Sequence, residues 1–174
     1  MLLSLESVRE LEMLLSLIQY ANGAPFVDPA HDLDMWVDSG ECGWGAHVAG
    51  QEVRGHFEAE WVGQSSTARE LKGLWLALSQ PEVRSLVTDR RVRLNMDSMC
   101  SIRNLIKGGG PVGGLVHLIK GIWVLCRDMN VSLLPRWQRR SEVMMQRADV
   151  LSKVHTLWEL RREFVESVLA TRGV

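Results

Sequence analysis

Strand-like segments follow one another closely in the first half of the chain, and their order is the feature that most constrains the fold. They read LDMWVD, WGAHVA and EVRGHFEAEW, at residues 33–38, 44–49 and 52–61. Only Gly50 and Gln51 separate the second segment from the third, a spacing typical of an antiparallel hairpin. The sequence therefore predicts an antiparallel meander of three strands at the start of a sheet.

A helical pattern separates this meander from the next strand. The helix is predicted to begin near Thr67 and Glu70, which fit the S/T-x-x-E capping box, and to end at Pro81. The segment RVRLNM, residues 91–96, then alternates apolar and polar side chains, as a half-buried strand does. Because a helix connects the two, this strand is predicted to pair in parallel with the strand at 33–38.

The remaining segments complete an α/β pattern. Helices are predicted at 98–107, 114–129 and 147–170, with a last strand at 131–137. We expect a mixed five-stranded sheet, with three antiparallel strands followed by parallel strands joined through crossover helices, and helices on both faces. Two parts are predicted: an N-terminal helix and connector over 1–32, and one domain over 33–174 that includes the C-terminal helix.

Composition indicates a soluble intracellular protein, in the cytoplasm or the nucleus. The three cysteines lie far apart and form neither a CxxC pair nor an even disulfide set. Glu6, Glu10 and Glu12 interrupt the apolar N-terminus, so no signal peptide is predicted. The longest apolar run of the second half, 115–126, is too short for a membrane span, and no membrane partner is expected.

The net charge of −1 conceals an asymmetry along the chain. Residues 1–83 hold 4 Lys and Arg against 13 Asp and Glu, whereas residues 84–153 hold 13 against 5. A basic half beside an acidic half suits a protein that attracts a polyanion and concentrates carboxylates at a metal site. Dispersed, solvated charge is the alternative explanation.

Acidic residues stand at the predicted strand ends. Asp38 closes the first strand and Asp97 follows the strand at 91–96, so parallel pairing would make them neighbours. Glu70 lies in the first turns of the helix that bridges these strands, and Asp149 begins the helix after the last strand. Each acid alone has an ordinary explanation as a turn, cap or helix-start residue. Their joint placement instead predicts that all four converge.

A cluster of carboxylates favours a particular chemistry. Like charges raise one another's pKa unless cations neutralise them. Ligand sets made of oxygen alone suit Mg²⁺ or Mn²⁺ rather than zinc. A pair of such ions can activate a water and stabilise the leaving oxygen in phosphodiester hydrolysis.

Segments around these acids resemble a known family in their order and spacing, over residues 33–158. They are VDSGECGWGAHV, SSTARELKGLWLAL, NMDSMCSIRNLIKGGG and LLPRWQRRSEVMMQRADVLSK. They are similar to the ribonuclease H domain of retroelement reverse transcriptases, especially of tyrosine-recombinase (DIRS-like) retrotransposons. The resemblance implies a ribonuclease H-like fold for residues 33–174 and an activity that cleaves the RNA strand of RNA–DNA hybrids.

The same resemblance implies roles for individual residues. It implies that Asp38, Glu70, Asp97 and Asp149 are the catalytic residues and the ligands of two Mg²⁺ or Mn²⁺ ions. By the same resemblance, Ser65, Ser66 and Thr67 before the glutamate are expected to contact the hybrid. Apart from the resemblance, Arg136, Arg139, Arg140 and Arg147 around the last loop are also expected to bind nucleic acid. The hybrid would be recognised by shape and 2′-OH groups. An attached or associated reverse transcriptase is a further expected partner.

The sequence also departs from the family pattern. Many relatives carry a histidine in the loop before the fourth acid, but residues 132–148 contain none, and His155 lies too late to replace it. Arginines occupy this loop instead; they can bind phosphate but cannot shuttle protons at neutral pH. Met99 stands where relatives often have a glutamine, and the loop over 136–149 is longer. These differences predict slower turnover and an altered grip on the hybrid.

Alternative readings remain open at this point. A ribonuclease H-like scaffold could keep its acids and serve as a catalytically weak or inactive module that binds protein or nucleic acid. Another nuclease or nucleotidyl transferase of the same fold is a further alternative. Residues 1–32 resemble the tail of a preceding polymerase or connection segment, although they could equally dock on the domain or mediate dimerisation through their leucine face.

Overall fold

The computed structural model describes residues 4–20, 30–109 and 113–153, and the chain divides into two compact units, Met1–Ala30 and His31–Val174. The first unit holds helix α1 (Leu5–Tyr20), which matches the predicted leading helix. The strands of the second unit are β1 (Leu33–Ser39), β2 (Gly43–Val48), β3 (Gln51–His56), β4 (Arg91–Met96) and β5 (Ser132–Trp137). Its helices are η1 (Ala59–Trp61), α2 (Ser66–Ser79), α3 (Pro81–Val87), α4 (Met99–Lys107) and α5 (Gly113–Asp128), followed by a helical segment at 143–153.

One five-stranded sheet organises the second unit, in the order β3-β2-β1-β4-β5. Pairs β3–β2 and β2–β1 are antiparallel, whereas β1–β4 and β4–β5 are parallel. The predicted mixed sheet is therefore confirmed, including the crossover that sets β4 beside β1. The antiparallel hairpin turns at Ala49 and Gly50, whose φ angles of 49° and 85° are both positive, as a two-residue type I′ turn requires.

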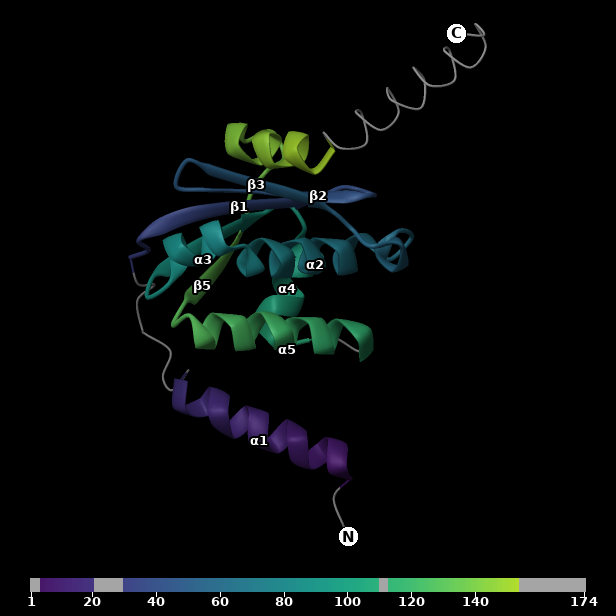
Figure 1. The fold of residues 1–174 in the computed structure, drawn as a ribbon, viewed down its shortest axis with the longest axis vertical. Helices are drawn as coiled ribbons and strands as arrows, with labels where there is room; N and C mark the ends of the chain where they lie inside the picture. The colour runs from purple at the N-terminus through teal and green to yellow at the C-terminus, as the bar shows by residue number, and fades with distance from the viewer. Residues whose placement is uncertain (1–3, 21–29, 110–112, 154–174) are drawn as a thin grey trace, which may run out of the picture. The chain divides into compact units, whose positions relative to one another are not determined.

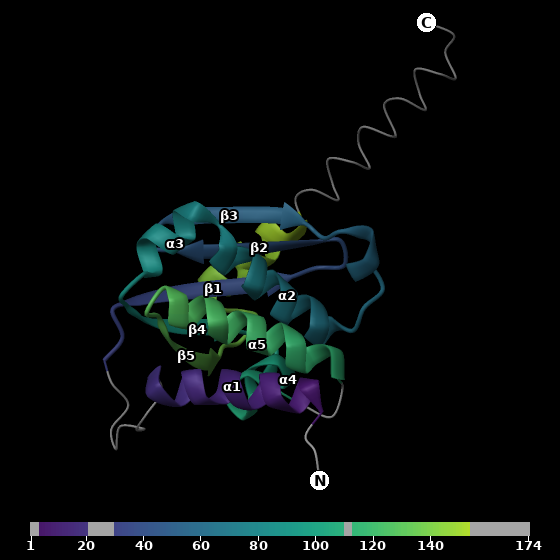
Figure 2. The same ribbon diagram turned by 60° about the horizontal axis from the view of Figure 1, so that its bottom comes forward.

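Helices cover both faces of the sheet (Figures 1 and 2). Helix α2 packs on β1 and β2, α5 packs on α2, and α4 packs beside β5, all on one face, while the segment 143–153 covers the opposite face. The core between the sheet and the first group of helices is apolar and fully buried, and includes Met35, Val37, Leu71, Leu74, Leu94, Ile119 and Ile122. Met145, Ala148 and Leu151 form a smaller buried layer under the segment 143–153.

Some predicted boundaries were wrong. The third strand was expected to reach residue 61, but β3 ends at His56, where the Phe57 N–H donates to the Cys42 carbonyl and the chain turns into η1. The capping box of Thr67 and Glu70 was also wrong. Ser65 is the N-cap of α2, and its side chain accepts a hydrogen bond from the Ala68 N–H at 3.2 Å. Glu70 is therefore free for another role.

The end of the domain differs from its prediction as well. The last helix begins at residue 143 rather than 147, so Asp149 lies in its second turn. The part of this predicted helix beyond 153 lies outside the described residues, as does most of the predicted connector at 21–32. Pro81 ends α2 as predicted, but it also opens α3 by occupying its first turn. Within the described ranges, no helix is long and apolar enough to cross a membrane.

Candidate metal centre

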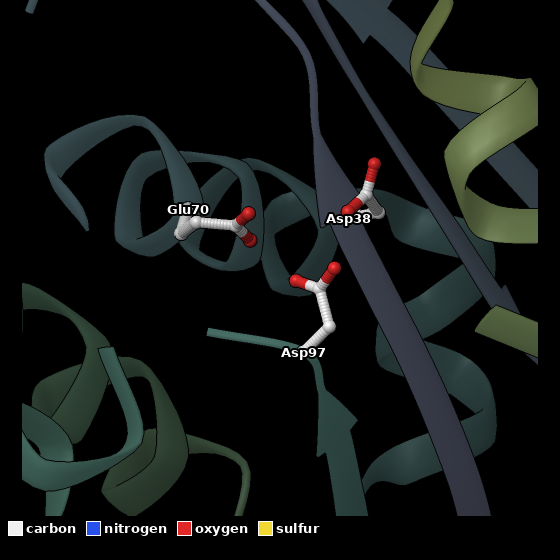
Figure 3. Close-up of side chains that lie close together, drawn as sticks. All are labelled: Asp38, Glu70 and Asp97. Atoms are coloured by element: carbon white, nitrogen blue, oxygen red, sulfur yellow. The ribbon is translucent and has the colours of Figure 1, made fainter. Parts of the chain in front are cut away.

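Carboxylates from three elements meet at one edge of the sheet. Asp38 lies near the carboxyl end of β1, and Asp97 directly follows β4. The parallel register pairs Trp36 with Asn95, so each aspartate stands two residues beyond that pair on its own chain. Figure 3 shows Glu70 of α2 reaching toward both, and one oxygen from each of the three acids lies within 4.8 Å of the others. The predicted convergence of these acids is therefore observed.

A glycine in α2 allows this convergence. A Cβ at Gly73 would lie 3.1 Å from the Cβ of Trp44 and closer still to the hydroxyl of Ser39. The helix backbone therefore packs directly against the side chains of Ser39 in β1 and Trp44 in β2, with no side chain of its own at this point. Glu70 lies three residues earlier on α2, so the same close packing holds its side chain against the strand ends.

Burial gives the cluster its electrostatic character. The side chains of Asp38 and Glu70 are only 1% and 6% exposed. Desolvation and the neighbouring charges of Asp97 and Asp149 together raise the pKa of Asp38 to about 6, against the opposing hydrogen bond from Ser152. Desolvation, with the charges of Asp38 and Asp97, raises the pKa of Glu70 to about 9. Such a cluster is unfavourable without a compensating cation.

The donor set fits a divalent cation that prefers oxygen. Among the described residues, the buried Oε2 of Glu70 has no hydrogen-bond partner, although it lies beside the two aspartates. Carboxylate oxygens supply all the ligand atoms of the cluster, which suits Mg²⁺ or Mn²⁺. The residues present therefore fit such an ion, and an added positive charge would lower the pKa of both buried acids.

Asp149 occupies a different position, at the rim of the cluster. It is 20% exposed, and its carboxylate pairs with the ammonium group of Lys153 at 2.7 Å. Arg140 also binds it, at 2.9 Å, and the same guanidinium lies 3.5 Å from Asp97 and 4.0 Å from Asp38. The charge of Asp149 contributes to raising the pKa of Asp38, so it lies close enough to act on the cluster. It is not one of the three mutually close acids.

The residues predicted to contact nucleic acid are distributed around this edge. Ser65 caps α2, and Ser66 and Thr67 form the first turn of that helix, just before Glu70. Arg136 and Arg139 are exposed at and after the end of β5. Arg140 lies among the acids, whereas Arg147 pairs with Glu52 of β3 and is already engaged there.

Sequence reasoning missed Ser152 and two glycines of β2. Ser152 is buried, and its hydroxyl lies 3.0 Å from Asp38 Oδ2. Its spacing of three residues from Asp149 on a helix was a usable signal, because residues i and i+3 share a helix face. Gly43 and Gly45 gave no such signal. Their lack of a side chain matters only because the segment 143–153 packs closely over β2.

The comparisons with known proteins address the fold. No protein-family model matches the sequence, and no curated protein is significantly similar to it. Among solved structures, ribonuclease H1 from the halophilic archaeon Halobacterium salinarum is similar with a TM-score of 0.51 and 15% identity, over 68% of this chain and 92% of that one. The N-terminal RNase H domain of Rv2228c from Mycobacterium tuberculosis gives 0.50 and 19%, over 69% and 91%.

A third solved structure agrees with these. LC11-RNase H1, isolated from compost by a metagenomic approach, has a TM-score of 0.51 and 16% identity, over 68% of this chain and 91% of that one. Identities this low identify a fold and not an activity. The DIRS-like subgroup named from the sequence stays a prediction. The sheet order, the crossover and the three comparisons together show that this chain has the ribonuclease H fold.

Proposed function

We propose that this protein is a metal-dependent endoribonuclease that hydrolyses the RNA strand of RNA–DNA hybrids. The observation that carries the proposal is the meeting of Asp38, Glu70 and Asp97 within 4.8 Å at the carboxyl ends of parallel strands. Ligand sites of open α/β sheets lie at such strand ends. The resemblance to retroelement ribonuclease H domains supports the hybrid as substrate and supports descent from a retroelement.

The proposed metal ligands are Asp38, Glu70 and Asp97, with Asp149 joining from the rim. Bound Mg²⁺ or Mn²⁺ ions, two in this proposal, would activate the attacking water and stabilise the leaving oxygen of the phosphodiester. The chain itself supplies the negative charge that attracts the ions and the burial that excludes competing water. Asp38 and Asp97 come from strands in a fixed register, so their separation is set by the sheet rather than by loops.

Basic and hydroxyl side chains around the acids are proposed to hold the hybrid. Arg136 and Arg139 are exposed at and after the end of β5 and would contact phosphates without reading bases. Ser65, Ser66 and Thr67 lie at the N-terminal end of α2, where backbone N–H groups also favour an anion. Arg147 would have to leave Glu52 to take part, so its contribution is expected to be the smallest. A reverse transcriptase on the same or a partner chain is part of the proposal.

A second candidate function rests on Arg140. Its guanidinium contacts Asp149, Asp97 and Asp38 together, and so places a positive charge beside the cluster. A chain that used this arginine in place of metal would be a ribonuclease H-like scaffold that binds partners without cleaving. The two functions differ in whether a divalent ion is needed for any activity.

Cleavage of a labelled RNA–DNA hybrid tests the proposal. The native chain is expected to cut the RNA strand with Mg²⁺ or Mn²⁺ and to show no cleavage with EDTA, while Asp38→Asn should reduce cutting about a thousandfold. Double-stranded DNA and single-stranded RNA serve as substrate controls. No cleavage by the native chain, with hybrid binding retained, would favour the scaffold. Preferential cleavage of double-stranded DNA would indicate another nuclease of this fold.

A further inference from the structure

The buried hydroxyl of Ser152 contacts the carboxylate of Asp38 and the backbone carbonyl of Asp149, on the side opposite to α2. Ser152 lies in the helical segment 143–153, one turn after Asp149, and is only 2% exposed. Its Oγ lies 3.0 Å from Asp38 Oδ2 and 2.8 Å from the backbone carbonyl of Asp149. A serine hydroxyl carries one proton, so it donates to one of these oxygens at a time. The bond to the carbonyl is the ordinary helical back-bond, whereas the bond to Asp38 is specific to this site.

The hydroxyl reaches Asp38 because the segment 143–153 lies unusually close to β2. A Cβ at Gly45 would lie 2.8 Å from both the Ser152 nitrogen and the Ala148 carbonyl oxygen. A Cβ at Gly43 would lie 2.9 Å from the Ser152 carbonyl oxygen. Any side chain at either position would push the helix outward. The two glycines of β2 therefore set the distance between Ser152 and the neighbouring strand that carries Asp38.

The geometry of the Asp38 carboxylate gives this contact a consequence. Ser152 holds Oδ2, while Oδ1 is the oxygen that lies 4.0 Å from Arg140, on the side of the other acids. A hydrogen bond to one oxygen restricts rotation of the carboxylate plane and leaves the other oxygen aimed at the cluster. Groups that hold a metal ligand in this way typically change metal affinity or activity 10–100-fold when removed.

We propose that Ser152 is a positioning residue that orients Asp38 for divalent metal and couples this orientation to the helix carrying Asp149. This inference rests on the proposed metal site. It assigns Ser152 no contact with metal or substrate: it acts through Asp38 alone. The coupling arises because one residue bonds to a strand acid and belongs to the same helical turn as the rim acid.

The test is Mn²⁺ affinity of the full chain, measured by titration calorimetry without substrate. Ser152→Ala is expected to weaken Mn²⁺ binding about tenfold or more, and Ser152→Thr, which keeps the hydroxyl, is expected to stay within about threefold of the native affinity. Ser79→Ala is the matched control. It removes another helical serine whose Oγ donates to a backbone carbonyl, that of Trp75 at 2.7 Å, remote from the acids. Its Mn²⁺ affinity is expected to equal that of the native chain.

Thermal unfolding of each variant, followed by circular dichroism, shows that binding is measured on folded protein. Native affinity in Ser152→Ala would overturn the inference and leave the metal site standing. An equal loss in Ser152→Thr and Ser152→Ala would also overturn it, since the hydroxyl would not be the cause. Absence of saturable Mn²⁺ binding by the native chain would instead reject the metal site, and the role of Ser152 with it.

Discussion

The inner acids of the cluster, Asp38 and Glu70, and the rim acid, Asp149, differ in burial and in their ion pairs. Asp38 and Glu70 are buried, and their pKa values are raised to about 6 and about 9. Asp149 is partly exposed and carries its own cations, Arg140 and Lys153. Burial between the sheet and α2 thus favours the protonated form of the inner acids, whereas the segment 143–153 supplies an acid already in ion pairs. An external cation would favour ionisation of the inner acids, and the rim acid already has its cations.

This difference indicates which positions form the metal site and which only modify its affinity or activity. Inner positions are fixed by strand register and by the close packing at Gly73, so a substitution there removes a ligand that nothing else replaces. The rim acid exchanges partners easily because ion pairs at partly exposed side chains contribute little free energy. Substitutions at the two kinds of position should therefore differ in size.

The largest expected effect is on catalysis. Asp38→Asn or Asp97→Asn should reduce hybrid cleavage by about three orders of magnitude, the rate equivalent of the several kcal/mol that metal ions supply. Asp149→Asn should reduce it only about tenfold to a hundredfold. Single-turnover rates of RNA-strand cleavage at saturating Mg²⁺ measure both. Equal losses at Asp149 and Asp38 would remove the distinction between inner and rim acids.

The next largest effect is on stability, through the packing of the segment 143–153 on β2. Gly45→Ala places a methyl group 2.8 Å from backbone atoms of the segment 143–153, and should lower the free energy of unfolding by about 1–3 kcal/mol, as overpacking does. Gly114→Ala is the control, because a Cβ there meets nothing within 4 Å and alanine favours a helix. Urea denaturation compares the two. A Gly45→Ala chain as stable as the native one would show that the helix does not depend on this close approach.

The pH dependence of stability reports on the inner acids. Their pKa values are raised above the unfolded values near 4, so the folded chain binds more protons between pH 4 and 9. Stability in EDTA should therefore be greatest at low pH within this range and fall as pH rises through about 6 and about 9. Melting temperatures across pH 5–9 measure this fall, and Glu70→Gln should flatten it. A rise in melting temperature over the same range would contradict the assigned pKa shifts.

The smallest effect concerns Arg140, which lies between the two kinds of acid. Arg140→Gln should strengthen Mn²⁺ binding by about threefold, because an exposed cation that competes with the metal contributes less than about 1 kcal/mol. Mn²⁺ titration at low ionic strength measures this change, with Arg139→Gln as the control. Weaker Mn²⁺ binding in Arg140→Gln would mean that the arginine supports the ion instead of competing with it.

Much of the sheet and the inner site could be predicted from the sequence. The strand-like segment at 33–38 and the alternating segment at 91–96, separated by a helix, predicted the parallel pairing that brings Asp38 and Asp97 together. Glu70 was correctly predicted to lie in the first turns of the helix, but the capping box behind that prediction was wrong, because Ser65 rather than Thr67 caps α2. Local patterns were sufficient because strand alternation and helix periodicity are short-range properties, and a helix between two strands favours their parallel pairing.

The remainder depends on contacts between segments far apart in the chain. Ser152 meets Asp38 across 114 positions, and only the packing of the segment 143–153 over Gly45 brings them together. Arg140 was predicted to bind phosphate from its place in a basic loop, but its position among the acids follows from the path of that loop after β5. The spacing of Ser152 and Asp149 indicates a shared helix face, but no periodic pattern in the sequence encodes the contact with Asp38 or the position of Arg140.

Anomalous diffraction from crystals soaked in Mn²⁺ would locate the ion without depending on activity. A peak is expected between the carboxylates of Asp38, Glu70 and Asp97, at about 2.0–2.6 Å from an oxygen of each, and this peak should be lost in Asp97→Asn. Full Mn²⁺ occupancy elsewhere on the chain, with no peak among these three side chains, would contradict the proposed metal site.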